Sequence, residues 1–270
     1  MWMPTGQELS VGTCVLLMGV LAISAMLSGL AGFGFSAIGA SALWILPPTQ
    51  AVPLLMLLST ANQSLAIFAL RDDMPRWRDW WPDGPAPYVI GGLLGVRLGL
   101  WMLVSLPATA VMLVLGAVLI GYTAWAFFSR AVPATQNASA PSAPSGWRWP
   151  VLVGMVGGTI GGFSAFPGAA VVMWAGLRRI PKLQLRAIVQ PYILAMQVVA
   201  LAMLAWSKPQ IFDRHFMTLL ILTLPVVLPL TTVGVRLFRR TSEGNFRLTV
   251  LLLVGISGAG LIGRGLVSLA

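Results

Sequence analysis

The chain has 270 residues, of which 57% are hydrophobic and only 9% are charged. A soluble domain carries about a quarter of its residues as charged side chains, because its surface faces water. This composition excludes an ordinary soluble domain and indicates a chain that lies in lipid. The net charge of +10 does not indicate nucleic-acid binding. The basic residues flank apolar segments and do not gather on one polar face.

The first apolar stretch, residues 11–46, is longer than the roughly 20 residues that one membrane span needs. The glycine-rich sequence Gly29-Leu-Ala-Gly-Phe-Gly-Phe-Ser36 interrupts it, and Pro47 and Pro48 end it, because proline cannot continue a helix. We therefore predict a pair of helices with a glycine-rich break. The sequence leaves open whether this pair is re-entrant or crosses the membrane twice.

A polar linker separates two sets of apolar segments. Residues 129–148 are rich in Ser, Ala, Pro, Thr, Gln and Asn and show no apolar periodicity. We therefore divide the chain into a first membrane repeat at 10–128, this linker, and a second membrane repeat at 149–267. After the first stretch, the predicted apolar segments lie at 50–70, 87–104, 107–128, 149–163, 164–177, 187–206, 214–237 and 246–267.

The second set of segments repeats motifs of the first in the same order. Gly34-Phe-Ser36 reappears as Gly162-Phe-Ser164, and Gly95-Val-Arg97-Leu98 reappears as Gly234-Val-Arg236-Leu237. These matches indicate an internal duplication. Two further pairs fit the same alignment, Gly32 with Gly161 and Gln63 with Gln197.

Charge predicts how the two repeats face. The loops at 178–186 and 238–247 are rich in Arg and Lys, which places them in the cytoplasm by the positive-inside rule. Tracing back from them puts the central linker in the cytoplasm and both termini outside. The two halves then enter the membrane from opposite sides. We predict an all-α polytopic protein of the cell inner (plasma) membrane, with two inverted repeats that each comprise a glycine-broken pair and three transmembrane helices.

The duplicated breaks predict a binding site near the midplane of the membrane. Unwound backbone survives in hydrocarbon only against protein or a polar cavity. A helix that starts after such a break directs its free amides and positive dipole end at that cavity, which suits an anion. We expect Ser36 and Ser164 at these helix starts. The alternative is that the glycines only allow close helix packing.

Polar side chains inside the predicted spans extend the candidate site. Arg97 lies deep in its span, where an ionisable residue is a functional hypothesis, and Arg236 is its repeat mate. Either arginine could instead extend to the membrane interface along its aliphatic stem. Four amide side chains could bind a ligand or bridge helices, namely Asn62, Gln63, Gln190 and Gln197.

The sequence offers no basis for catalysis or a cofactor. All seven acidic residues fall in predicted loops or at segment ends, and His215 lies at the outer end of a span. We find no metal cluster, nucleotide motif or nucleophile triad, and predict neither an enzyme nor a metal site. The expected partners are a small anion and membrane lipid, with no nucleic acid; a homo-oligomer stays open.

The duplicated breaks and the paired Gly-x-Arg-Leu segments resemble the TauE/SafE family of sulfite and organosulfonate exporters. The resemblance covers about 11–266 and implies a bacterial or archaeal inner-membrane protein, with plant relatives, that moves sulfite, sulfoacetate or other small organic acids. The chain departs from an ideal repeat at Phe166-Pro167, where the first half has Ile38-Gly39. The resemblance marks Gly32, Gly34, Ser36, Gly161, Gly162, Ser164, Arg97 and Arg236.

The resulting prediction is a secondary transporter of a small anion, an exporter by resemblance, that works by alternating access. The anion would be sulfite, an organosulfonate or another small organic acid. A passive anion channel and a non-transporting membrane scaffold are the alternatives. The sequence does not decide the anion, the direction or the coupling ion.

Overall fold

The computed structural model describes residues 11–69, 71, 77–81, 84–131, 146–178, 180, 182–238 and 243–269. Every regular element among them is a helix, as predicted. The elements are α1 (Val11–Ala31), α2 (Phe35–Gly39), the 3₁₀ helix η1 (Ala40–Trp44), α3 (Pro48–Ala69), the 3₁₀ helix η3 (Trp77–Trp80), α4 (Ala86–Ser105), α5 (Ala108–Ala131), α6 (Arg148–Ser164), α7 (Gly168–Leu177), α8 (Lys182–Ser207), the 3₁₀ helix η4 (Pro209–Ile211), α9 (Arg214–Phe238) and α10 (Glu243–Val267).

The outside of the bundle is apolar. Six of the described helices are long and apolar enough to cross a membrane. Large aliphatic side chains on their outer faces, such as Leu94 and Ile221, are about two-thirds exposed in the isolated chain. Water would not favour so many exposed apolar side chains, but lipid does. The chain is therefore a polytopic helical membrane protein.

The helix boundaries follow the predicted segments closely, except around the linker and at two helix starts: α7 begins later than predicted, at Gly168, and α8 earlier, at Lys182. α5 continues to Ala131, so the first residues of the predicted linker are helical. α6 begins at Arg148. Residues 132–145 of the predicted linker, and residue 10, the predicted start of the first membrane repeat, lie outside the residues that the structure describes.

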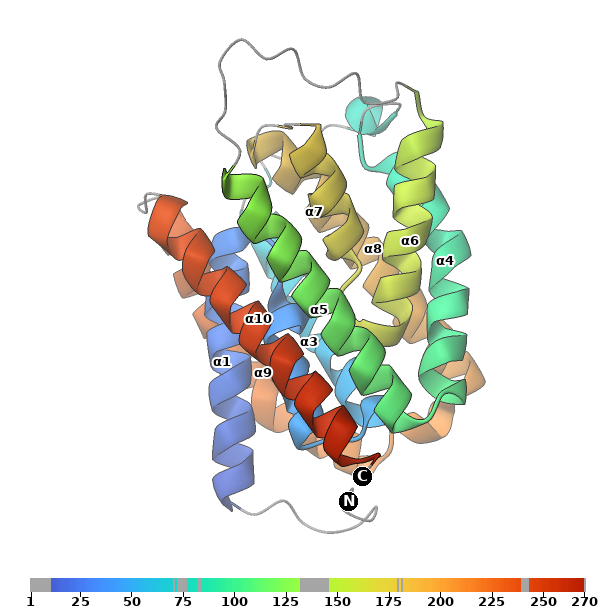
Figure 1. The fold of residues 1–270 in the computed structure, drawn as a ribbon, viewed down its shortest axis with the longest axis vertical. Coiled ribbons are helices and arrows are strands. Elements are labelled where there is room, and N and C mark those ends of the chain that lie inside the picture. Colours follow the sequence, from blue (N-terminus) through green and yellow to red (C-terminus); the bar gives the residue numbers. More distant parts are fainter. Residues whose placement is uncertain are drawn as a thin grey trace.

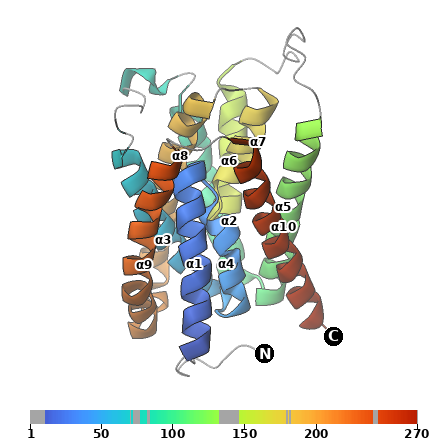
Figure 2. The same cartoon turned by 90° about the vertical axis from the view of Figure 1, so that its left-hand side faces the viewer.

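The first helices of the two halves run in opposite directions. In Figure 1, α1 rises from the lower end of the bundle, whereas α6 descends from the upper end. The turned view in Figure 2 agrees, and in both views α5 and α10 lie side by side. α2 with η1, and α7, each comprise about ten residues, too few to cross a membrane that needs about 20. Each broken pair therefore combines a long helix with a half-length helix.

Helices of one half pack most closely on helices of the other. α4 packs along α6, and α1 packs along α9. Glycines recur every fourth residue at the α4–α6 contact, where the backbones touch: a Cβ on Gly95 would overlap the carbonyl oxygen of Met155. At the α1–α9 contact, a Cβ on Gly234 would likewise overlap the carbonyl oxygen of Met26. The contact glycines between α4 and α6 are Gly91, Gly95, Gly99, Gly154, Gly158 and Gly162.

The first half-length helix is held from the side by α10. The hydroxyl of Ser257 donates a hydrogen bond to the Ile38 carbonyl at 3.3 Å, and the guanidinium of Arg264 donates one to the Trp44 carbonyl. Gly260 lets the Trp44 ring lie directly on α10. These contacts fix α2 and η1 inside the bundle, with the first break next to the core.

Candidate functional site

The first break comprises Gly32, Phe33 and Gly34, between α1 and α2. Gly32 has a φ of 83° and Gly34 a φ of 91°, in the left-handed region that glycine enters without strain. The amide of Gly32 donates a hydrogen bond to the Ser28 carbonyl at 2.7 Å, which caps the end of α1. The glycines that the sequence singled out therefore form a break in the helix.

The second break does not lie where the repeated motif placed it. Ser164 is the last residue of α6, so our expectation that it starts the following helix is wrong. Its hydroxyl donates to the Ile160 carbonyl at 2.5 Å and accepts from the Phe166 amide at 3.3 Å. The physical reason is Pro167: the residue before a proline avoids the helical region, so α6 ends and α7 begins after the proline.

Two glutamines occupy equivalent positions at the two breaks. Gln63 Nε2, from α3, donates to the Gly32 carbonyl at 3.3 Å. Gln197 Nε2, from α8, donates to the Ala165 carbonyl at 3.1 Å. Both carbonyls belong to residues with positive φ, 83° and 59°. The counterpart of Gly32 is therefore Ala165 and not Gly161. The Thr60 hydroxyl, three residues before Gln63 on α3, lies 3.5 Å from the side-chain oxygen of Gln197, so α3 contacts α8 beside the second break.

Arg186 places a positive charge at the first break. Its side chain is only 5% exposed, and it is the one charged side chain buried among the described residues. Its Nη2 donates a hydrogen bond to the Gly29 carbonyl at 2.8 Å. Its Nε would lie 2.8 Å from a Cβ on Gly32, so only glycine leaves room for the guanidinium there. The sequence interpretation missed this residue because it counted Arg186 in a cytoplasmic basic loop, but α8 begins earlier, at Lys182.

One face of α8 runs from the first break to the second. Arg186, Gln190, Ile193 and Gln197 follow at intervals of four, three and four residues, which is one side of an α-helix. Arg186 contacts the first break, and Gln197, about 16 Å further along at 1.5 Å per residue, contacts the second. Gln190 therefore lies between the two breaks. This stripe is the sequence signal by which Arg186 could have been found.

Buried polar atoms collect between the breaks. Gln190 is fully buried, and neither atom of its side-chain amide has a hydrogen-bond partner among the described residues. The same holds for the side-chain oxygen of Gln63 and for the hydroxyl of Ser36, in the first turn of α2. Buried polar atoms are almost always paired in proteins, so these four atoms, on α8 and beside the first break, indicate a site that a ligand or water fills.

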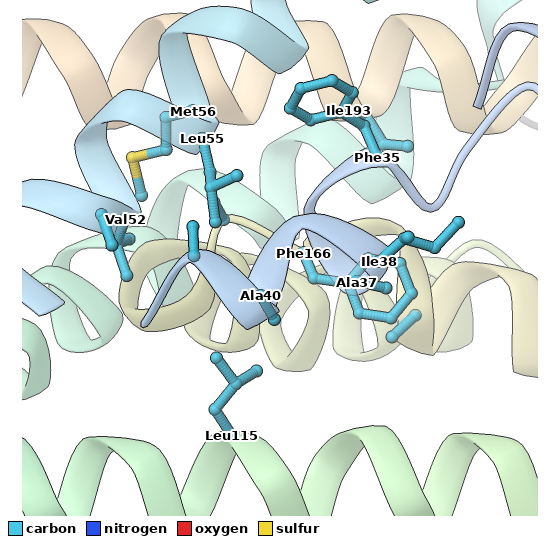
Figure 3. Close-up of a cluster of buried hydrophobic side chains, with 14 of the residues drawn as sticks. Phe35, Ala37, Ile38, Ala40, Val52, Leu55, Met56, Leu115, Phe166 and Ile193 are labelled. Atoms are coloured by element: carbon cyan, nitrogen blue, oxygen red, sulfur yellow. The ribbon is translucent and has the colours of Figure 1, made fainter. Parts of the chain in front are cut away.

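The surrounding walls are apolar. Figure 3 shows Phe35, Ile38, Phe166 and Ile193 in one cluster of buried side chains that joins the two breaks. Gly168, the first residue of α7, packs against Ile193, where an added Cβ would lie 2.9 Å from the Ile193 side chain. The face of α8 that carries Gln190 and Gln197 therefore packs against the start of α7 at Ile193.

The two arginines of the repeated Gly-x-Arg-Leu motif face outward. Arg97 and Arg236 are both exposed, so neither lies at the breaks. The contact residue of each motif is its glycine, Gly95 or Gly234. Because Arg97 follows Gly95 by two residues, about 200° of helix rotation, it lies on the opposite face of α4. A ligand contact at Arg97 or Arg236 stays a prediction, and the structure places neither residue beside the breaks.

Three other candidates have packing or bridging positions. Asn62 Nδ2 donates to Ser28 at 2.9 Å, and Asn62 Oδ1 accepts from Thr231 at 2.7 Å, which ties α3 to α1 and α9. Gly161 packs on Pro167, and Gly162 packs on the backbone of α4. For these residues the structure favours the packing alternative. Among the described residues no group of three or more His, Cys, Asp or Glu could hold a metal ion.

The comparison with known protein families agrees with the fold of a helical membrane protein. The model of the family described as "Sulfite exporter TauE/SafE" matches residues 15–261, nearly the whole chain. The chain belongs to this family. No curated protein and no solved structure matches the chain. The TauE/SafE family is a family of membrane exporters of sulfite and related anions, which supports a transporter role for this chain.

Proposed function

We propose that this TauE/SafE protein is a secondary transporter that moves one small anion, such as sulfite, an organosulfonate or another small organic acid, by alternating access. The anion would bind at the first break, beside Arg186. Gln63, Gln190 and Ser36 would contact its oxygen atoms, and Phe35 and Ile193 would enclose the rest. Export is the direction that the family name favours.

The observation that carries this proposal is the buried polar cluster at the first break. A guanidinium that is 5% exposed lies against Gly32 and Gly29, and Gln190, one helical turn further along α8, has two buried amide atoms without a partner among the described residues. Buried in low dielectric, a positive charge attracts an anion more strongly than it would in water. Arginine also binds oxyanions through two parallel hydrogen bonds.

The second break is less suited to a ligand. Its polar groups bond to one another: Gln197 to Ala165, Ser164 to Ile160, and Phe166 to Ser164. We therefore propose one binding site at the first break and not two equivalent half-sites. This site differs from the sequence expectation, in which Ser36 and Ser164 contribute equally to the binding of the anion.

Cross-packing of the halves supports alternating access. α1 packs with α9 and α3, whereas α4 packs with α6 and α8. These two groups meet chiefly where α3 lies on α8. The proposed binding site is bordered by Gln63 of α3 and by Arg186 and Gln190 of α8. We propose that the repeats are inverted, since α1 and α6 enter from opposite ends in Figure 1. We also propose that the group of α1, α3 and α9 rocks against the group of α4, α6 and α8 about the binding site.

We also propose the inner membrane as the location, with the start of α6 facing the cytoplasm. α5 ends, and α6 and α8 begin, at the same upper end of the bundle in Figure 1. Arg148 and Arg178 belong to this end, in line with the positive-inside rule. The start of α1 and the end of α10 lie at the opposite end, which would face outward.

Reconstituted protein provides the test. Proteoliposomes that contain the native chain are loaded with unlabelled sulfite, sulfoacetate, sulfate or acetate, and uptake of the labelled anion is followed. A carrier predicts uptake that saturates and transient accumulation driven by the unlabelled anion inside. Flux that rises linearly with concentration, without counterflow, would identify a channel instead. No movement of any anion would contradict transport of these substrates.

A further inference from the structure

The polar atoms at the first break include hydrogen-bond acceptors as well as donors. Gln63 uses its Nε2 on the Gly32 carbonyl, and this bond orients the amide, so the buried atom left without a partner among the described residues is its carbonyl oxygen. An amide oxygen accepts hydrogen bonds and cannot donate them. Gln63 therefore presents an acceptor.

Gln190 adds a second acceptor and a donor. Its side chain is fully buried, and both its oxygen and its nitrogen lack a partner among the residues that the structure describes. It follows Arg186 by one helical turn on the same face of α8. Arg186 supplies guanidinium donors, and the Ser36 hydroxyl can donate or accept. The cluster therefore combines donors for an anion with two amide oxygens that an anion alone cannot satisfy.

We propose that the substrate is an oxyanion that carries its own hydrogen-bond donor, such as a hydroxyl or acidic O–H group, next to its charged oxygens. The charged oxygens lie at Arg186, and the donor group reaches Gln190 Oε1, one helical turn further along the same face of α8. This inference rests on the proposed transport function and narrows its substrate class. A fully deprotonated oxyanion without such a group would leave both buried acceptors unpaired, which is the costly arrangement.

Selectivity follows from this chemistry. A site built to bond a substrate hydroxyl rejects the analogue that lacks it, because the buried partner group then remains unpaired. An unpaired buried acceptor of this kind lowers affinity by about 10- to 100-fold. A binding site that recognises only the negative charge would instead bind the substrate with the hydroxyl and the analogue without it equally well.

Matched pairs of anions test the inference. Binding and counterflow are measured for 2-hydroxyethanesulfonate against ethanesulfonate, and for 2-hydroxypropionate against propionate, each pair equal in charge and differing in one hydroxyl. The variant Gln190→Met removes one acceptor and the amide donor. Gln184→Met is the matched control, because Gln184 lies on the same helix but is exposed.

The inference predicts that the native chain prefers the hydroxylated member of at least one pair by about 10- to 100-fold. It also predicts that Gln190→Met loses this preference and Gln184→Met keeps it. Equal affinities within both pairs in the native chain, with saturable transport intact, would overturn the inference and leave the proposed function standing. Absence of exchange for every anion tested would overturn the proposed function itself. The decisive comparison uses the native chain, so it holds even where Gln190→Met does not fold.

Discussion

The guanidinium of Arg186 donates a hydrogen bond to the carbonyl oxygen of Gly29 at 2.8 Å. A helix of the second half thereby caps the last turn of the broken helix of the first half. The negative end of the α1 dipole favours a cation at this position. A substrate anion at the same guanidinium would change this contact, so the charge that would bind the substrate also touches the hinge of the first break.

The glycines between α4 and α6 should be sensitive to a single added methyl group. A Cβ on Gly95 would overlap the Met155 carbonyl, so we expect Gly95→Ala to lower stability by about 1–3 kcal/mol. Gly121 in α5 has nothing within 4 Å of an added Cβ, so Gly121→Ala should be neutral or stabilise by about 0.5–1 kcal/mol. Thermal unfolding in detergent measures both. Equal effects of the two substitutions would contradict the backbone contact.

The two breaks should respond differently at their equivalent positions. Gly32→Ala introduces a Cβ at a φ of 83° and 2.8 Å from Arg186 Nε, so we expect a loss of about 1–2 kcal/mol from backbone strain and weaker anion binding. Ala165→Gly should change stability little, because relief of strain is offset by about 0.4–1 kcal/mol of unfolded-chain entropy. Unfolding and anion-binding measurements on both variants check this. Unchanged anion binding in Gly32→Ala would show that the anion does not bind at the first break.

Asn62 should matter for stability and not for substrate. Asn62→Leu removes the bonds to Ser28 and Thr231 and leaves buried polar groups without this partner, at a cost of about 1–3 kcal/mol. Anion affinity per folded molecule should stay near that of the native chain. Reduced affinity at unchanged stability would return Asn62 to the binding site.

The proposed sidedness can be measured with single cysteines in a Cys14→Ser background. Lys208 and Gly146 are both exposed. Lys208 follows the end of α8 and Gly146 precedes the start of α6, and these helix ends lie at opposite ends of the bundle in Figure 1. A membrane-impermeant maleimide should label Lys208→Cys on intact cells, and should label Gly146→Cys only after the membrane is opened. The reverse pattern would invert the topology.

Hydropathy and proline positions predicted most of the fold. The apolar segments were found because each is bounded by Gly, Pro or charge, and Pro47 and Pro48 lie where the first broken pair ends and α3 begins. The glycine break before α2 was also found, because Gly32 and Gly34 adopt the positive φ values that glycine permits. Whether the repeats are inverted stays a prediction.

The site was predicted less well, because a linear sequence does not show which helix face is buried. Arg97 lies deep along α4, as expected, but the glycine face of that helix is the packed one and Arg97 lies opposite. The basic loop at 178–186 predicts only a topology signal at Arg186, although the spacing of Arg186 to Gln190 and Gln197 places all three on one side of α8. Pro167 shifted the second break past Ser164 and made the two breaks unequal.

The most direct test of the account compares Arg186→Gln with Arg97→Gln in the counterflow assay. Both substitutions remove one arginine charge, but only Arg186 is buried at the first break. Loss of a charged hydrogen-bond partner should raise the half-saturating anion concentration by about 10- to 100-fold in Arg186→Gln. Arg97→Gln should transport as the native chain does. Normal transport by Arg186→Gln, or loss of transport in Arg97→Gln alone, would contradict an anion-binding site at the first break.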